Sequence, residues 1–253
     1  MADTYIVKPV YKALQVLLAL AEANRPLTLT EVCHTLRLPK TTVFRYLQTL
    51  RASGFVMLDD DGNQYRLGVR LWELGQLAGS NIPVREIAMP YLYELRDQFN
   101  ETINLGILDG KDVVYLEMAE SRLSLRTQAR LGGRDPIYST GLGKAILAFL
   151  PEEQWPYHLP ARLTARTGNT LTTLAALRRD LADSRGRGYA IDRGENEDGA
   201  YCLAAPIFNQ RNRAMAAISL SAPANRLQEQ QKPVIAVALC TAAAAISRRL
   251  GHT

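Results

Sequence analysis

Two separate helix-start signals near the N-terminus allow only short, distinct helices in that part of the chain. Thr28-Leu-Thr-Glu31 is a capping box, in which the threonine hydroxyl and the glutamate carboxylate each accept a hydrogen bond from a free amide at a helix start. Pro39 suits the first turn of another helix, because its missing amide hydrogen has no intrahelical partner there. The sequence therefore predicts one helix from Thr28 to about Leu36 and another that starts near Pro39 and is ended by Gly54.

The neighbouring segments complete a small domain. Residues 10–24 carry apolar side chains at helical spacing, and Asn-Arg-Pro at 24–26 ends that helix. Residues 55–58 and 64–68 are short strand-like segments joined by an Asp-Gly turn, which is a hairpin signal. Three helices followed by a hairpin within residues 1–67 is the layout of a winged helix-turn-helix domain.

The helix that starts near Pro39 has one apolar and one polar face. Val43, Leu47 and Leu50 fall within one narrow arc, which must face the core. The opposite arc carries Thr, Gln and Arg side chains, which are types that hydrogen-bond to base edges in the DNA major groove. The residues expected to contact DNA are Lys40, Thr41, Thr42, Arg45, Tyr46, Gln48, Thr49, Arg51 and Arg66.

Individual roles follow from the chemistry of these side chains. Arg45 can pair bidentately with a guanine edge and Gln48 with an adenine edge, whereas Lys40 lies where a phosphate would pass. The acidic residues 59–61 crowd the tip of the hairpin and would repel phosphates, so Arg66 on the returning strand is the expected contact of the wing. A solvated polar helix face without a partner is the alternative interpretation.

The rest of the chain separates into a connecting helix and a larger domain. Residues 68–82 are expected to form a linker helix. Residues 83–253 mix helical and strand patterns, which predicts an α+β domain with an antiparallel sheet and helices on its faces. Strands are expected at 102–108, 112–119, 123–129, 202–208 and 214–222, and helices at 84–99, from 140 onward, at 172–188 and at 228–250.

Composition narrows the class of protein. The 253 residues are 47% hydrophobic, which is enough for a packed core, and the net charge of +5 is compatible with a nucleic-acid partner. The three cysteines are far apart and form no C-x-x-C pair, so neither a disulfide framework nor a zinc ribbon is indicated. No apolar run approaches the ~20 residues that span a bilayer. We therefore expect a cytoplasmic protein with no metal, no cofactor and no membrane association.

The segment 139–144, Ser-Thr-Gly-Leu-Gly-Lys, opens a helix whose free backbone amides suit a carboxylate. Gly141 and Gly143 would let a ligand approach the backbone closely. A Walker A loop needs glycine where Tyr138 stands, and a dinucleotide-binding fingerprint needs glycine where Ile146 stands, so neither nucleotide motif is present. A tight helix start that is packed by its own glycines is the alternative.

Four segments together resemble the IclR family of bacterial transcriptional regulators. They are LPKTTVFRYLQTLRASGFV at 38–56, YRLGVRLWELG at 65–75, IYSTGLGKAILAFL at 137–150 and GYAIDRGENEDGAYCLAAPIF at 188–208. Within the family, the chain is most similar to regulators of sugar-acid catabolism. The resemblance implies a winged helix-turn-helix, a linker helix and a GAF-like effector-binding domain. It also implies a homodimer formed through the N-terminal domains, often assembled into a dimer of dimers, that binds a palindromic operator in double-stranded DNA.

The resemblance also places an effector site in the C-terminal domain. The residues that match the family's effector contacts are Gly141, Leu142, Asp192, Cys202, Ser219 and Ser221. The first two supply backbone amides for the carboxylate of a small organic acid. The two serines are two positions apart on a predicted strand, so their side chains point to the same face.

Two other interpretations of these residues remain open. The acidic cluster at 192–198 could bind a metal, but a solvated loop with one inward acid, Asp192, accounts for it more simply. Cys202 could be a nucleophile, but it has no neighbouring histidine in the sequence, so we interpret it as lining the pocket.

These predictions describe a ligand-responsive transcriptional regulator with no catalytic residues. We expect a repressor of a catabolic operon that is relieved by a small carboxylate such as a sugar acid or a keto acid. The alternatives are an activator on the same scaffold, an enzyme of the GAF type with a vestigial DNA-binding module, and an architectural DNA-binding protein that responds to no ligand.

Overall fold

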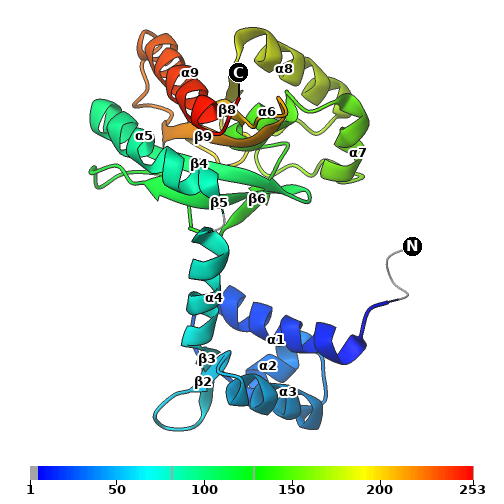
Figure 1. Ribbon diagram of the computed structural model, residues 1–253. Coiled ribbons are helices and arrows are strands. Elements are labelled where there is room, and N and C mark those ends of the chain that lie inside the picture. Colours follow the sequence, from blue (N-terminus) through cyan, green and yellow to red (C-terminus); the bar gives the residue numbers. More distant parts are fainter. Residues whose placement is uncertain (1–4, 81, 128, 253) are drawn as a thin grey trace. The chain divides into compact units, whose positions relative to one another are not determined.

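The chain divides into two units, residues 1–81 and residues 82–253, in the computed structural model, which describes residues 5–80, 82–127 and 129–252 (Figure 1). Each unit has its own buried apolar side chains. None of the helices in the described part of the chain combines the length and the hydrophobicity that a membrane span requires.

The described residues of the first unit form four helices and a small antiparallel sheet. Its elements in chain order are α1 (Lys8–Ala23), β1 (Leu27–Thr28), α2 (Leu29–Leu36), α3 (Lys40–Ala52), β2 (Val56–Leu58) and β3 (Gln64–Leu67). Helix α4 (Val69–Ser80) follows the sheet. The sheet has the order β1-β3-β2, so the predicted hairpin gains a third strand. The sequence did not predict β1, because two residues are too few to show the alternation that marks a strand.

The helix boundaries of this unit follow from the predicted caps. The hydroxyl of Thr28 accepts a hydrogen bond from the amide of Glu31, and the Glu31 carboxylate accepts one from the amide of Thr28 at 2.7 Å, which confirms the capping box. Pro39 is the N-cap of α3, one position earlier than a first-turn proline. Gly54 follows the end of α3 with φ +78°, a backbone conformation that favours glycine.

The second unit is built on a six-stranded sheet in which every neighbouring pair is antiparallel. Its order is β6-β5-β4-β9-β8-β7. The strands are β4 (Thr102–Asp109), β5 (Asp112–Ala119), β6 (Arg134–Pro136), β7 (Ala190–Asp192), β8 (Ala200–Phe208) and β9 (Ala214–Pro223). The pairing of β4 with β9 places residues that are distant in the sequence side by side at the centre of the sheet.

Helices cover both faces of this sheet (Figure 1). One face packs against α5 (Pro83–Phe99) and α9 (Gln231–Arg249), through apolar side chains such as Leu92, Leu239 and Ile218. The other face packs against α6 (Gly141–Leu147) and α8 (Leu174–Arg187), and the short α7 (Trp155–His158) lies between these two helices in the chain.

The strand predicted at 123–129 is wrong for the described residues of that segment, which exclude Gln128. Its backbone is held by side chains instead of by a neighbouring strand. The Thr127 carbonyl accepts a hydrogen bond from the Thr102 hydroxyl at 3.2 Å, and the Leu125 carbonyl accepts one from Arg226 at 2.7 Å. The alternating leucines that suggested a strand are exposed to solvent.

Candidate functional site

Helix α3 presents most of the predicted DNA-contacting side chains to solvent. Lys40, Thr41, Arg45, Thr49 and Arg51 are exposed, and the predicted apolar arc on the opposite side of the helix is buried. The exposed arc therefore offers cationic and hydroxyl donors to base edges and phosphates in a DNA groove.

Other members of the predicted set contribute less surface. Thr42, Tyr46 and Gln48 are partly buried, and Tyr46 packs against the core of the unit. The Thr49 hydroxyl donates a hydrogen bond to the Arg45 carbonyl at 2.9 Å, so its hydrogen is used within the helix. The sequence reasoning also missed Phe44, which is exposed on the same helix and could contact a thymine methyl group.

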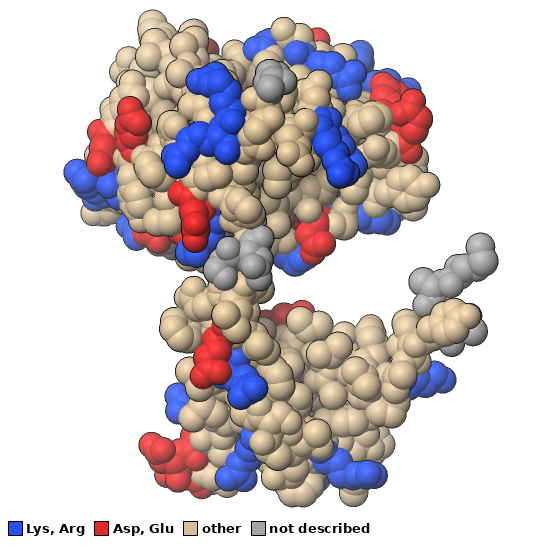
Figure 2. Space-filling model, in the orientation of Figure 1, with Lys and Arg blue, Asp and Glu red and all other residues tan. Residues whose placement is uncertain are grey.

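The loop between β2 and β3 carries three acidic residues, and one of them, Asp59, has a structural role. The Asp59 carboxylate accepts hydrogen bonds from the amides of Asn63 and Gln64, each at 2.9 Å, and so closes the loop. Asp60 and Asp61 are exposed, and Figure 2 shows acidic residues clustered at this loop. Arg66 is exposed on β3, away from the tip of the loop.

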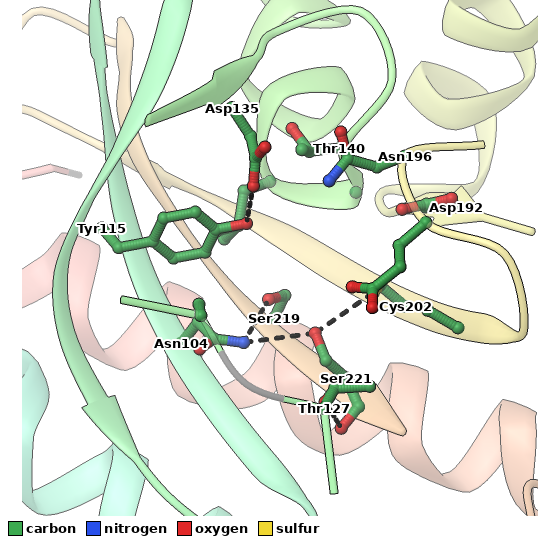
Figure 3. A pocket seen from close by; sticks show the side chains of 15 residues that line it. Asn104, Tyr115, Thr127, Asp135, Thr140, Asp192, Asn196, Cys202, Ser219 and Ser221 are labelled. Atoms are coloured by element: carbon green, nitrogen blue, oxygen red, sulfur yellow. Dashed lines mark hydrogen bonds between the residues drawn. The ribbon is translucent and has the colours of Figure 1, made fainter. Parts of the chain in front are cut away.

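A pocket in the second unit brings the predicted effector residues together (Figure 3). It lies over the strands β4, β8 and β9, beside the start of α6 and the loop that follows β7. All six predicted residues line it. The other lining residues are Asn104, Tyr115, Thr127, Ala129, Asp135, Thr140, Asn196, Glu197 and Ala200.

The start of α6 leaves two amides beside this pocket without a hydrogen-bond partner in the described part of the chain. The Thr140 hydroxyl accepts a hydrogen bond from the Gly143 amide at 3.0 Å, as an N-cap does. The amides of Gly141 and Leu142, in the first turn, have no partner among the described residues. Free amides in the first turn of a helix attract an anion.

The two glycines at the start of α6 allow close packing within the protein, whereas the sequence reasoning expected them to admit a ligand. A Cβ on Gly143 would lie 2.2 Å from the Ile137 carbonyl oxygen, so this glycine lets the helix pass close to its own chain and not to a ligand. A Cβ on Gly141 would lie 3.2 Å from that of Cys202, which keeps α6 tight against β8. The expectation that Gly143 admits a ligand is therefore corrected, while Gly141 does line the pocket.

The floor of the pocket is a polar network across three strands. Asn104 on β4 lies directly opposite Ser219 on β9, and Cys202 on β8 lies opposite Ser221. The Asn104 amide nitrogen donates to the Ser221 hydroxyl at 3.2 Å and to the Ser219 hydroxyl at 3.5 Å. The Ser221 hydroxyl donates to the Cys202 sulfur at 3.1 Å. Burial raises the pKa of the Cys202 thiol, so the sulfur stays neutral and lines the pocket instead of acting as a nucleophile.

The pocket wall carries acidic groups in different environments. Asp135 accepts hydrogen bonds from the Tyr115 hydroxyl at 3.1 Å and from Arg166 at 3.3 Å. Asp192 is 2% exposed and accepts one from the Glu195 amide at 2.6 Å. Burial, the largest cause, raises the pKa of Asp192 to about 6 in spite of that hydrogen bond.

The sequence reasoning expected Asp192 to be the one inward acid of the cluster at 192–198, but Glu195 in the loop after β7 is buried as well. Glu195 is buried behind the pocket and pairs with the Lys144 ammonium at 2.5 Å, and Asp180 approaches the same ammonium at 3.1 Å. Lys144 is fully buried, so this pair ties the loop to α6. Among the described residues, no group of His, Cys, Asp and Glu side chains is arranged to hold a metal ion.

A winged helix-turn-helix joined to an α+β unit that holds a polar pocket is the architecture of a transcriptional regulator. Comparisons with known proteins identify the family. Residues 9–60 match the IclR helix-turn-helix domain, and residues 76–248 match the bacterial transcriptional regulator IclR C-terminal domain. The chain belongs to the IclR family, whose members are transcriptional regulators and not enzymes. The predicted α+β fold is confirmed.

Individual relatives span nearly the same length. The chain is 35% identical over 248 residues to the transcriptional regulator XynR of Escherichia coli (strain K12), with 98% of both chains covered. It is 33% identical over 228 residues to the transcriptional repressor IclR of the same organism, with 89% of this chain and 83% of the repressor covered. The crystal structure of an IclR homologue from Microbacterium hydrocarbonoxydans complexed with 4-hydroxybenzoate superposes with a TM-score of 0.83 at 27% identity, covering 96% of this chain and 98% of that one.

Proposed function

We propose that this regulator represses a catabolic operon, and that a small carboxylate bearing hydroxyl or keto groups binds the pocket and weakens the hold on DNA. One observation carries this proposal: Gly141 and Leu142, whose amides have no partner among the described residues, line the same pocket as Ser219 and Ser221. The amides suit the carboxylate, and the Ser219 hydroxyl, whose hydrogen is not used within the floor, suits a further oxygen of the ligand.

The acidic lining supports a hydroxylated ligand. Asp135, Asp192 and Glu197 all line the pocket, and no Lys or Arg is among its described lining residues. A bare anion would be repelled by these groups, unless ligand hydroxyls donate to them or Asp192 takes up a proton as the ligand binds. A sugar acid satisfies both needs, because it carries one carboxylate and several hydroxyls.

The relatives support the two halves of the proposal. A repressor among them supports the sign of regulation, and the homologue bound to 4-hydroxybenzoate supports a carboxylate as the ligand. On the DNA side, α3 enters the major groove of a palindromic operator, with Arg45 reading a base and Lys40, Arg51 and Arg66 near phosphates. Such an operator needs a homodimer, and the family favours a dimer of dimers acting in the cytoplasm.

Calorimetry of the free protein against sugar acids, keto acids and aromatic acids tests the ligand class. Binding of the cognate acid should lower operator affinity by roughly 5–150-fold, and the same factor must separate acid binding to free and DNA-bound protein. The double variant Ser219→Ala/Ser221→Ala should lose the response and keep its affinity for the operator.

Each other result is informative. An acid that raises operator affinity identifies an activator. If no acid binds, or if a bound acid leaves operator affinity unchanged, the proposal is wrong. If the double variant binds the acid as tightly as the wild type, the acid does not occupy this pocket.

A further inference from the structure

Asn104 lies in the pocket floor with one end of its side-chain amide unpaired. The residue is 2% exposed on β4, and its amide nitrogen points toward Ser219 and Ser221 (Figure 3). Its Oδ1 is buried and accepts no hydrogen bond from a described residue. A buried acceptor without a donor is unfavourable, so a ligand that supplies a donor at this point gains affinity.

The other buried acceptors of the pocket wall already have donors. Asp135 accepts from Tyr115 and Arg166, and Asp192 accepts from the Glu195 amide. Within the described lining, the Asn104 oxygen is therefore the acceptor that most needs a hydrogen from the ligand.

The hydrogen bonds around Asn104 also fix the direction in which Ser219 acts. The Ser219 oxygen accepts from the Asn104 nitrogen, so the hydroxyl hydrogen of Ser219 is free to point into the pocket. The Ser221 hydroxyl hydrogen is directed to the Cys202 sulfur instead. The floor of the pocket thus offers one donor, the Ser219 hydroxyl, and one acceptor, Asn104 Oδ1, on residues that lie opposite each other on neighbouring strands.

We propose that Asn104 is a specificity-determining residue that selects ligands with a hydroxyl group at this position over ligands with a keto group or a methylene. This inference rests on the proposed function of the pocket. A hydroxyl both donates to Asn104 Oδ1 and accepts from Ser219 through a single oxygen. A keto oxygen can accept but cannot donate, and a methylene can do neither.

Matched ligand sets test the selection directly. Calorimetry compares lactate with pyruvate and propionate, and gluconate with hexanoate. The wild type should bind each hydroxy acid about tenfold or more tightly than its partners, as expected for a site that hydrogen-bonds the hydroxyl. Asn104→Leu removes the acceptor at similar volume and should bring the ratio close to one. Asn63→Leu, the same change in the hairpin of the other unit, should leave the ratio at its wild-type value.

The outcomes separate this inference from the proposed function. If no acid binds the wild type, the proposed function fails and the inference fails with it. If acids bind without preference for the hydroxyl, or if Asn104→Leu keeps the preference, only the inference is overturned. Should Asn104→Leu not fold, a crystal structure of the wild type with the tightest hydroxy acid decides, because Oδ1 must lie within about 2.5–3.0 Å of a ligand hydroxyl oxygen. A longer separation overturns the inference.

Discussion

Replacement of Asp192 by asparagine should stabilise the second unit, residues 82–253, at neutral pH. The Asp192 carboxyl is 2% exposed, and burial raises its pKa from 3.8 to about 6. A rise of this size, about 2 pKa units, corresponds to about 3 kcal/mol of free energy by which folding disfavours the ionised form. Asp192→Asn removes the charge and keeps an oxygen that accepts from the Glu195 amide, which donates at 2.6 Å in the wild type.

The sign follows from proton binding in the two states. Between about pH 4 and pH 6 the folded state holds a proton on Asp192 that the unfolded state has lost, so the free energy of unfolding falls as the pH rises through this window. Above about pH 6 the loss is complete. The variant lacks this loss, so its advantage over the wild type should grow from near zero at pH 4 to about 3 kcal/mol at pH 8.

Urea unfolding at fixed subunit concentration measures this difference. The chain has two tryptophans, and Trp155 is buried in the second unit. In a Trp72→Phe background the tryptophan fluorescence therefore reports on the second unit alone. Wild type and variant are compared at several pH values from 4 to 8. A difference in stability that stays constant across this range would refute the reasoning, because it would show that Asp192 does not titrate differently in the folded state.

Three further predictions concern packing, buried charge and DNA contact. Lys144→Met should lower the free energy of unfolding by about 3–5 kcal/mol, because it leaves the Glu195 carboxylate buried without its cation, and Glu195→Gln in the same chain should recover part of the loss in urea titrations. Gly143→Ala should lower the melting temperature, since the added Cβ would meet a carbonyl oxygen at 2.2 Å; an unchanged melting temperature contradicts this. Arg45→Ala should weaken binding to the operator alone, by ~1–3 kcal/mol of binding free energy per half-site. Lys40→Ala should weaken binding to all DNA and make the affinity less dependent on salt. Gel-shift titrations on operator and on scrambled DNA separate the two effects.

Local signals in the sequence predicted most of the first unit. The capping box at Thr28, the proline before α3 and the apolar arc of that helix each depend on residues within a few positions of one another. The same holds for the hairpins and for the final helix of the second unit. Interactions of this range leave a pattern that periodicity and capping rules can detect.

The pocket depends on interactions that leave no such pattern. Asn104 is a single polar residue in an apolar strand, and only the register of β4 against β9 places it opposite Ser219. Lys144 and Glu195 lie far apart in the sequence, so their buried pair could not be seen there. Motif resemblance supplied the six predicted effector residues, whereas the residues that orient them are found only from strand register and helix packing.

The order of the two units along the chain determines which of them can fold first during synthesis. The first unit has its own internal contacts, and its residues leave the ribosome first. The pocket floor forms only when β9, near the end of the chain, inserts between β4 and β8. Pairing across so many intervening residues is slow compared with local folding. Premature termination after residue 81 but before β9 therefore yields a chain that keeps the helix-turn-helix unit and lacks the complete pocket.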